Sequence, residues 1–110
     1  MTKNKKELII CIINRGFSDL VMTAARNAGA TGGTILHARG TGNKDIEKFF
    51  GIQITPEKEI CLIVVPSEVK DKVTSEIYKD AGLDTKGQGI IFTLPVDDFI
   101  GPSLIKEEKK

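Results

Sequence analysis

Two stretches of the chain are apolar at every position, and they constrain its fold more than any other feature. Residues 8–13 read LIICII, and residues 60–65 read ICLIVV. Runs of this length are typical of β-strands. Because successive side chains of a strand point to opposite faces of its sheet, both faces of these two strands need to be buried.

Two segments with helical periodicity follow the two runs. Apolar side chains recur on one helix face in residues 18–28 and at every fourth position in residues 67–81. A serine at the start of a helix can cap its free N–H groups, and a glycine after its end accepts a positive φ. These residues predict the ends of the two helices: Ser18 and Gly29, then Ser67 and Gly82.

Residues 34–39 and 90–94 complete the pattern as two further strands. The order strand, helix, strand, strand, helix, strand is the split βαβ, ferredoxin-like arrangement of the α+β class. Right-handed crossovers put both helices on one face of an antiparallel four-stranded sheet, with residues 8–13 and 60–65 in its centre. The other face of these central strands is also apolar and has no further element to cover it, so we expect the chain to assemble with copies of itself.

The length and charge of the chain limit what it can bind. The 110 residues predict one domain, 1–110, with a polar loop at about 43–56 and a C-terminal tail at about 103–110. The net charge of +1 gives no basis for nucleic-acid binding. The apolar runs are too short to insert into a membrane, and no signal peptide is recognisable. Two cysteines without a disulfide pattern favour a cytoplasmic location.

Patterns for catalysis and for metal binding are missing from the sequence. His37 has no serine, cysteine or carboxylate at a diagnostic spacing, so a solvent-facing or structural role is expected. Asp97 and Asp98 are expected to begin a turn. Cys11 and Cys61 lie inside the apolar runs, as buried thiols do, and one histidine with two separated cysteines predicts no zinc site.

Two Gly-x-Gly segments are the remaining candidates for a ligand site. Residues 40–42 (GTG) follow the second strand, and residues 87–89 (GQG) precede the fourth. Neither matches the dinucleotide fingerprint or a P-loop, and each alone can be a turn. In the split βαβ layout, however, both can face a cleft between subunits, where free backbone N–H groups suit an anion.

The chain resembles the nitrogen-regulatory P-II signalling proteins over nearly its whole length. Residues 29–35 (GATGGTI) with residues 39–42 (RGTG) are similar to the family's second strand and the root of its long T-loop. Residues 63–66 (IVVP) are similar to its third strand entering the second helix. Residues 87–96 (GQGIIFTLPV) resemble its Gly-Asp-Gly-Lys-Ile-Phe signature.

This resemblance implies a homotrimer of ferredoxin-like subunits that serves signal transduction in nitrogen regulation. Such a trimer binds adenine nucleotides in clefts between subunits, and its T-loop reports the ligand to a partner such as a membrane transporter or a metabolic enzyme. The positions that correspond to the ligand site are Ile12, Thr34, Gly40, Thr41, Gly42, Asn43, Lys58, Leu62, Val64, Gly87, Gln88, Gly89 and Ile90. Among them, Thr34 matches the hydroxyl that meets adenine, and Lys58 matches a lysine that meets a 2-oxoglutarate carboxylate.

The loop has its own candidates for binding a partner protein. Apolar side chains within an otherwise polar loop suit a docking anchor. The expected partner-binding residues are Lys44, Phe49, Phe50 and Ile52.

Several positions depart from the family's pattern. Four of its cationic positions are uncharged here, at Ile90, Asn43, Gly101 and Ser103. With fewer cations for the terminal phosphates, AMP or ADP is expected to bind more tightly than ATP. The loop is shorter than the T-loop and lacks the tyrosine that is modified in some members. The one tyrosine, Tyr78, is expected to be partly packed beside an apolar helix face and to stay unmodified.

Two other classes of function stay open. One is an enzyme on a dimeric ferredoxin-like barrel, with His37 or Asp97 as the catalytic residue. The other is an assembly module that binds no ligand. A trimer without turnover favours the signalling protein, and a dimer counts against it. Within the signalling class, 2-oxoglutarate and bicarbonate stay open as ligands beside the nucleotide.

Overall fold

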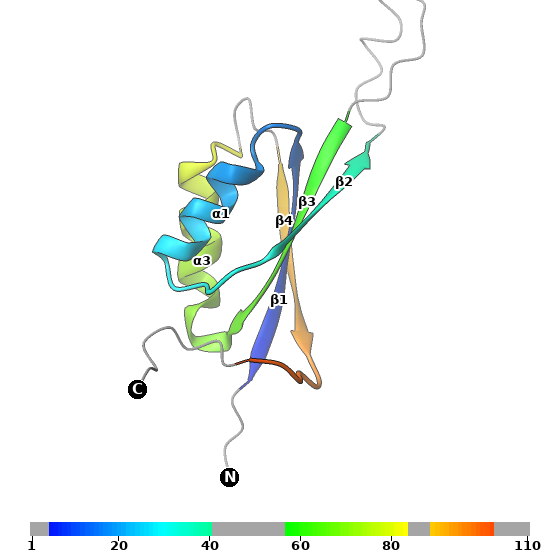
Figure 1. The fold of residues 1–110 in the computed structure, drawn as a ribbon. Coiled ribbons are helices and arrows are strands. Elements are labelled where there is room, and N and C mark those ends of the chain that lie inside the picture. The colour runs from blue at the N-terminus through cyan, green and yellow to red at the C-terminus, as the bar shows by residue number, and fades with distance from the viewer. Residues whose placement is uncertain (1–4, 41–56, 84–88, 103–110) are drawn as a thin grey trace, which may run out of the picture.

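The computed structural model describes residues 5–40, 57–83 and 89–102. In these ranges the chain forms β1 (Lys6–Asn14), α1 (Ser18–Asn27), β2 (Thr34–Arg39), β3 (Glu57–Pro66), α3 (Ser67–Asp80) and β4 (Ile90–Val96). The strands make one antiparallel sheet in the order β2-β3-β1-β4, and both helices lie on the same face of it (Figure 1). The expected α+β, ferredoxin-like fold is therefore confirmed, including the central places of β1 and β3.

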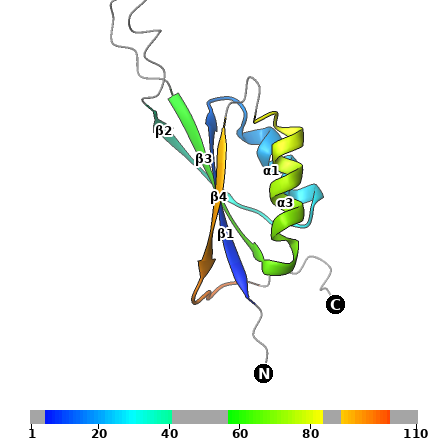
Figure 2. The ribbon, with the colours of Figure 1, turned by 180° about the vertical axis from the view of Figure 1, so that it is seen from behind.

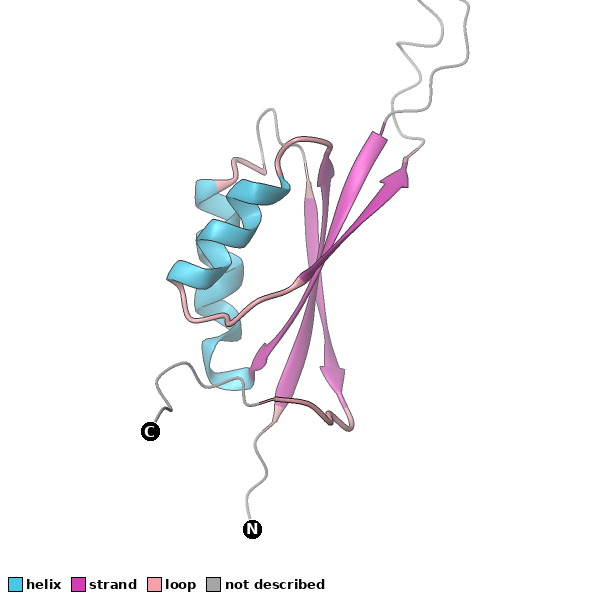
Figure 3. Cartoon of the chain, in the orientation of Figure 1, coloured by secondary structure: helices cyan, strands magenta, loops and turns pink. Residues whose placement is uncertain are grey.

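The core lies between the helices and the sheet (Figure 3). Alternate residues of the two central strands point into this layer, as the two-residue period of a strand requires. Helix α1 packs against α3, and small side chains on α1 let the helix approach the sheet. The fully buried residues include Ile9, Cys11, Ile13, Val21, Ala25, Cys61, Ile63, Val65, Val73 and Ile77.

The ends of the helices confirm the glycine predictions and correct the serine ones. Gly29 has φ +122° and Gly82 has φ +60°, so each adopts the left-handed backbone after its helix. Ser18 and Ser67, however, are the first helical residues and not the caps. The cap positions belong to Phe17 and Pro66, and neither cap donates or accepts a side-chain hydrogen bond.

The tertiary structure explains why the two serines are not caps. Strand β3 runs directly into α3 at Pro66, whose extended backbone (φ −62°, ψ 145°) leaves no residue between strand and helix. At α1, the free N–H groups are met by a carboxylate of β3, which is described below. Both helix starts are thus set by the sheet and not by a local serine.

The other face of the sheet, called the open face here, has no cover within the described ranges (Figure 2). Cross-strand partners share a face, so the register gives the rows of side chains on it. The rows are Leu94-Leu8-Val64, then Phe92-Ile10-Leu62-Thr34, then Ile90-Ile12-Ile60-Leu36. The side chains at its edges, such as Leu36, Ile90 and Phe92, are exposed. The sequence-based expectation of an uncovered apolar face is confirmed for the single chain.

Some expectations concern parts of the chain that the structure does not describe. The loop at about 43–56 and the tail at about 103–110 both lie outside the described ranges. In the ranges that are described, neither helix is long and apolar enough to cross a lipid bilayer.

Candidate functional site

One end of the sheet brings together the two glycine segments. At this end, called the loop-root end here, β1 and β2 finish and β3 and β4 begin (Figure 1). Gly40 follows β2 and Gly89 precedes β4. Because β2 and β4 are opposite edges of the sheet, the widths of β3 and β1 separate the two glycines within one chain.

Six of the expected ligand residues share the open face, namely Ile12, Thr34, Lys58, Leu62, Val64 and Ile90. Thr34 is the cross-strand partner of Leu62, and Ile12 is the partner of Ile90. Val64 lies one row further along β3, opposite Leu8. The structure therefore brings these positions together on one face, in two groups toward the two edges of the sheet.

Lys58 lies at the loop-root end of the open face. It is the cross-strand partner of Asn14 on one side and Ala38 on the other. Its Nζ donates a hydrogen bond to Asn14 Oδ1 at 2.7 Å. The lysine stem passes close to Gly40, because a Cβ added there would lie 3.0 Å from Lys58 Cε. An alanine at Gly40 would therefore have to displace the lysine stem by a few tenths of an ångström.

The residue before Lys58 is fixed to the turn between β1 and α1. The Glu57 carboxylate accepts a hydrogen bond from Arg15 Nη1 at 2.6 Å, and Arg15 N donates to Glu57 O at 3.2 Å. Both side chains are more than half exposed, so the pair adds little stability. It does tie the first residue of β3 to the end of β1.

Glu59 is the one carboxylate among the described residues that is buried beneath a helix start. Its Oε1 accepts hydrogen bonds from Gly16 N at 3.2 Å and Ser18 N at 3.3 Å, and its residue exposure is 7%. His37 Nδ1 lies 3.8 Å from its other oxygen. A hydrogen bond with the Ser18 side chain, aided by these N–H groups and by His37, lowers the pKa of Glu59 against the effect of burial.

Sequence reasoning missed this carboxylate, although a signal for it exists. Glu59 is in phase with Cys61, Ile63 and Val65, all of which are fully buried on the helix-covered face. A carboxylate on this buried face of β3 needs hydrogen-bond donors, and the free N–H groups at the N-terminus of a helix supply them. Asn14 and Arg15 were missed because their partners lie more than 40 positions away in the chain.

Gly89 owes its identity to close packing. A Cβ added there would lie 2.8 Å from the backbone oxygen of Ile12 and would overlap the Ile13 side chain. Its N–H donates to Leu83 O at 3.1 Å, which fixes the approach to β4. The rest of the glycine segments, namely Thr41, Gly42, Gly87 and Gln88, lies outside the described ranges.

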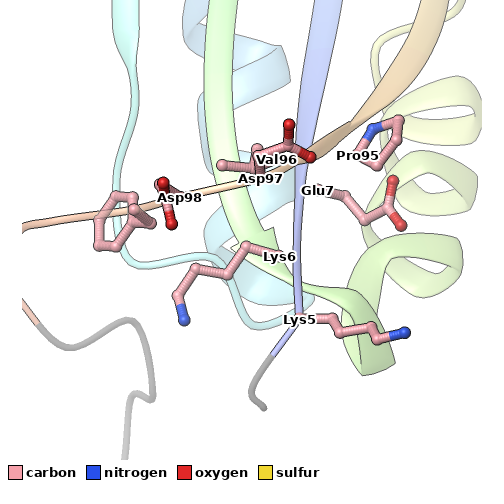
Figure 4. A pocket seen from close by; sticks show the side chains of 8 residues that line it. Lys5, Lys6, Glu7, Pro95, Val96, Asp97 and Asp98 are labelled. Carbon is pink, nitrogen blue, oxygen red and sulfur yellow. The ribbon is translucent and has the colours of Figure 1, made fainter.

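The two candidates for the catalytic residue of the enzyme alternative, His37 and Asp97, lie at opposite ends of the sheet. His37 is near the loop-root end, with a side chain that is 78% exposed. Asp97 follows β4 at the opposite end of the sheet, where the chain bends as predicted. Asp97 and Asp98 there line a pocket of about 540 Å³ with Lys5, Lys6 and Glu7 (Figure 4).

Charges of both signs surround this pocket. Lys5 and Glu7 extend to one side of β1 and Lys6 extends to the other side (Figure 4). The Lys6 Nζ lies 5.5 Å from the ring centroid of Phe99, a cation–π distance. Glu7 is engaged by the Ser67 hydroxyl at 3.5 Å. At this pocket Lys6 and Glu7 are thus in contact with Phe99 and Ser67.

The expected packing of Tyr78 is wrong. The residue is 52% exposed and borders a groove of about 430 Å³ between α3 and β4. Its neighbour Ile77 is the member of the helix stripe that is fully buried. One position along a helix turns a side chain by about 100°, so adjacency to the stripe did not bury the ring. The ring of Tyr78 is accessible, so packing does not support the prediction that this tyrosine stays unmodified.

The expected partner-binding residues are outside the structure's described part. Lys44, Phe49, Phe50 and Ile52, together with the ligand candidate Asn43, all fall between β2 and β3. What the structure gives is the root from which that segment departs, at Gly40, and the root to which it returns, at Glu57.

Comparison with known proteins gives a family match over most of the chain. The sequence model of the family described as nitrogen regulatory protein P-II matches residues 6–102. No curated protein sequence matches the chain.

Solved structures share the fold. The CPII protein of Thiomonas intermedia K12, bound to ADP, AMP and acetate, is 13% identical with a TM-score of 0.66 over 87% of this chain and 90% of its own. Arabidopsis thaliana PII bound to citrate is 24% identical, with a TM-score of 0.65 and coverage of 86% and 79%. The B. subtilis GlnK–ATP complex is 17% identical, with a TM-score of 0.62 and coverage of 87% and 85%.

Proposed function

The chain belongs to the nitrogen regulatory protein P-II family, whose members are non-enzymatic signal transducers, and from this premise we propose that it is a trimeric sensor of an adenine nucleotide. In this proposal the nucleotide binds in clefts between subunits in the cytoplasm. The segment between β2 and β3 then acts on a partner protein, either a membrane transporter or a metabolic enzyme.

The uncovered apolar face of the sheet is the observation that carries this proposal. Its three rows of side chains leave an apolar surface that a monomer would expose to water. Contiguous surfaces of this kind mark association sites. Joining the open faces of three copies buries the rows, and it places the edge of one sheet beside the edge of another.

The position of the glycine segments supports a ligand site at those edges. Gly40 and Gly89 are at the same end of the sheet but on opposite edges. An assembly that brings β2 of one copy near β4 of the next creates a cleft that contains both segments. Of the candidate base contacts, Thr34 and Val64 lie on β2 and β3, and Ile12 lies on β1 next to β4.

The number of phosphates in the ligand follows from the charges at the site. The four family cations are replaced by Ile90, Asn43, Gly101 and Ser103. Charge-assisted hydrogen bonds contribute about 1.5–3 kcal/mol each, so the loss of two weakens a triphosphate by about 3–6 kcal/mol. We therefore propose AMP or ADP as the nucleotide, bound more tightly than ATP.

Calorimetry and light scattering test this function together. The purified chain should scatter as a trimer and should bind ADP or AMP more tightly than ATP. A monomer or dimer contradicts the trimeric sensor, and clearly tighter ATP binding shows that other cations serve the terminal phosphates. Assays with 2-oxoglutarate and bicarbonate complete the ligand panel.

Partner binding is tested on the segment outside the described ranges. Replacing Phe49 and Phe50 by serine should leave the trimer and nucleotide binding unchanged and abolish partner capture. Loss of the trimer instead would assign these two residues to the core.

A further inference from the structure

At the loop-root end of the open face, a cation is held in place by an uncharged side chain. Lys58 Nζ donates to Asn14 Oδ1 at 2.7 Å in a partly buried contact. On the other side of the lysine, Gly40 packs against the stem, because an added Cβ would lie 3.0 Å from Cε and 3.1 Å from Cγ. The strand register places Asn14 and Lys58 directly opposite each other. The ammonium group therefore has a defined position before any ligand arrives.

The two carboxylates that flank Lys58 in sequence are engaged elsewhere. Glu57 pairs with Arg15 at 2.6 Å, and Glu59 turns to the opposite face to meet the start of α1. Within residues 5–40, 57–83 and 89–102, no carboxylate forms an ion pair with Lys58. The positive charge of Lys58 is therefore oriented without being compensated by these residues.

The contrast between Arg15 and Lys58 shows what a neutral holder achieves. Arg15 forms an ion pair with a carboxylate, which compensates its positive charge. Lys58 meets an amide oxygen, which accepts one hydrogen bond and leaves two of the three ammonium donors and the full charge for another group. Holding a lysine in advance also removes much of the rotamer freedom that ligand binding would otherwise have to restrict.

We propose that Asn14 is a positioning residue, which holds Lys58 as the cation that receives the anionic group of the ligand. This inference rests on the proposed function and deepens it. The group is a phosphate of the nucleotide or the carboxylate of a second ligand, since both offer oxygen acceptors to an ammonium. Asn14 acts through Lys58 and needs no contact with the ligand.

Two substitutions at one position separate positioning from packing. Asn14→Asp keeps the size and the contact but gives Lys58 a compensating charge, so the anion should bind about 10- to 100-fold more weakly, as expected for a lost charge-assisted hydrogen bond. Asn14→Ala frees the lysine and should weaken binding less, by about three- to tenfold. The unfolding midpoint of Asn14→Asp should equal or exceed that of the wild type, because the variant gains an ion pair.

Calorimetry on the full chain would use ADP, 2-oxoglutarate, and 2-oxoglutarate in saturating ADP. A loss confined to ADP assigns the phosphate to Lys58, and a loss confined to 2-oxoglutarate assigns the carboxylate. Lys58→Gln should match or exceed the loss in Asn14→Asp. Lys72→Gln, which removes an equal charge from the exposed side of α3, should bind as the wild type does.

The possible failures are distinguishable. If the wild type binds ADP and Asn14→Asp binds every probe equally well, the role of Asn14 is wrong and the proposed function stands. If Asn14→Asp weakens ligand binding and also lowers the unfolding midpoint below that of the wild type, the residue is structural and the inference is wrong. If the wild type binds none of the probes, both the proposed function and the inference are overturned.

Discussion

The two faces of the sheet are built from the same strands, yet only one of them is completed by the chain itself. On the helix-covered face, residues such as Ile9 and Ile63 have no exposed surface. On the open face, their neighbours Ile10 and Leu62 are equally apolar but meet no helix. The fully buried strand residues of the covered face are apolar, with the carboxylate of Glu59 buried beside them, whereas the open face carries Thr34 at its β2 edge and Lys58 at its loop-root end.

Stability and function are therefore assigned to different faces of the same strands. The covered face buries its side chains within one subunit and determines whether the chain folds. In the proposed trimer the open face buries its side chains between subunits, and the polar groups at its rim lie in the clefts. A residue one position along a strand can therefore change from a folding role to an assembly or ligand role.

Aspartate substitutions at two adjacent positions of β3 should have the largest and most different effects on the two faces. Ile63→Asp puts an unpaired charge into the covered core, which should cost more than about 4 kcal/mol and leave the chain unfolded. Leu62→Asp puts the same charge on the open face and should yield a folded monomer. Circular dichroism measures the fold and light scattering measures the assembly. A Leu62→Asp variant that stays trimeric removes the open face from the interface, and an unfolded one shows that the monomer is not stable alone.

The buried carboxylate gives the next largest effect. Glu59→Gln removes the charge that holds Gly16 N and Ser18 N, so the free energy of unfolding at pH 7 should fall by about 1–3 kcal/mol. Glu57→Gln is the matched control on the same strand face, and its exposed ion pair should be worth less than about 1 kcal/mol.

The stabilisation from Glu59 has a defined dependence on pH. Folding lowers the pKa of Glu59 from its ordinary value of 4.5. The ionised form is therefore favoured in the folded state, and its contribution is fully present above pH 4.5 and is lost as the pH falls through the lowered pKa. Urea unfolding of wild type and Glu59→Gln at several pH values should show the two curves converging in acid. A constant gap down to pH 3 would contradict this origin.

Much of the fold could be predicted from sequence because its signals are local. The strand over residues 34–39 and the helix stops at Gly29 and Gly82 agree with the structure. The central strands are longer than their apolar runs, since pairing with neighbours continues into polar residues such as Asn14 and Lys58. The starts of the helices could not be derived in this way, because Glu59 caps α1 from 41 residues away.

The candidate site was less accessible to sequence reasoning. The resemblance to the P-II family pointed to Thr34, Leu62 and Lys58, and the strand register places them on one face. The neutral contact between Asn14 and Lys58 depends on which residues are opposite each other in the sheet, which one sequence does not contain. The position of Tyr78 beside an apolar helix stripe predicts a partly packed ring, whereas the ring is 52% exposed because the stripe faces the sheet through Ile77.

Alanine substitutions at Gly32 and Gly33, just before β2, should differ in their effect on the free energy of unfolding. A Cβ at Gly33 would lie 2.9 Å from the backbone oxygen of Leu62 and from side-chain atoms of Ile63 and Met22, whereas a Cβ at Gly32 meets nothing within 4 Å. Gly33→Ala should therefore lower the free energy of unfolding by about 1–3 kcal/mol, as overpacking does. Gly32→Ala should stay within about 0.5 kcal/mol of wild type. Equal losses in urea unfolding would mean that backbone freedom and not packing requires these glycines.

Thiol reactivity should also distinguish the two faces of the sheet. Burial raises the pKa of the Cys11 thiol to about 12 and that of Cys61 to about 11, with smaller contributions from Cys61 and Glu59 respectively. Because the thiolate is the nucleophile, at pH 8 Cys11 should react about a thousandfold and Cys61 about a hundredfold more slowly than a thiol of pKa 9.0. Both should react at ordinary rates in urea. A third cysteine introduced as Ile10→Cys, on the open face, should be protected in the trimer and react rapidly when Leu62→Asp is added. Rapid reaction of that thiol in the otherwise wild-type assembly would show that copies of the chain do not cover the open face.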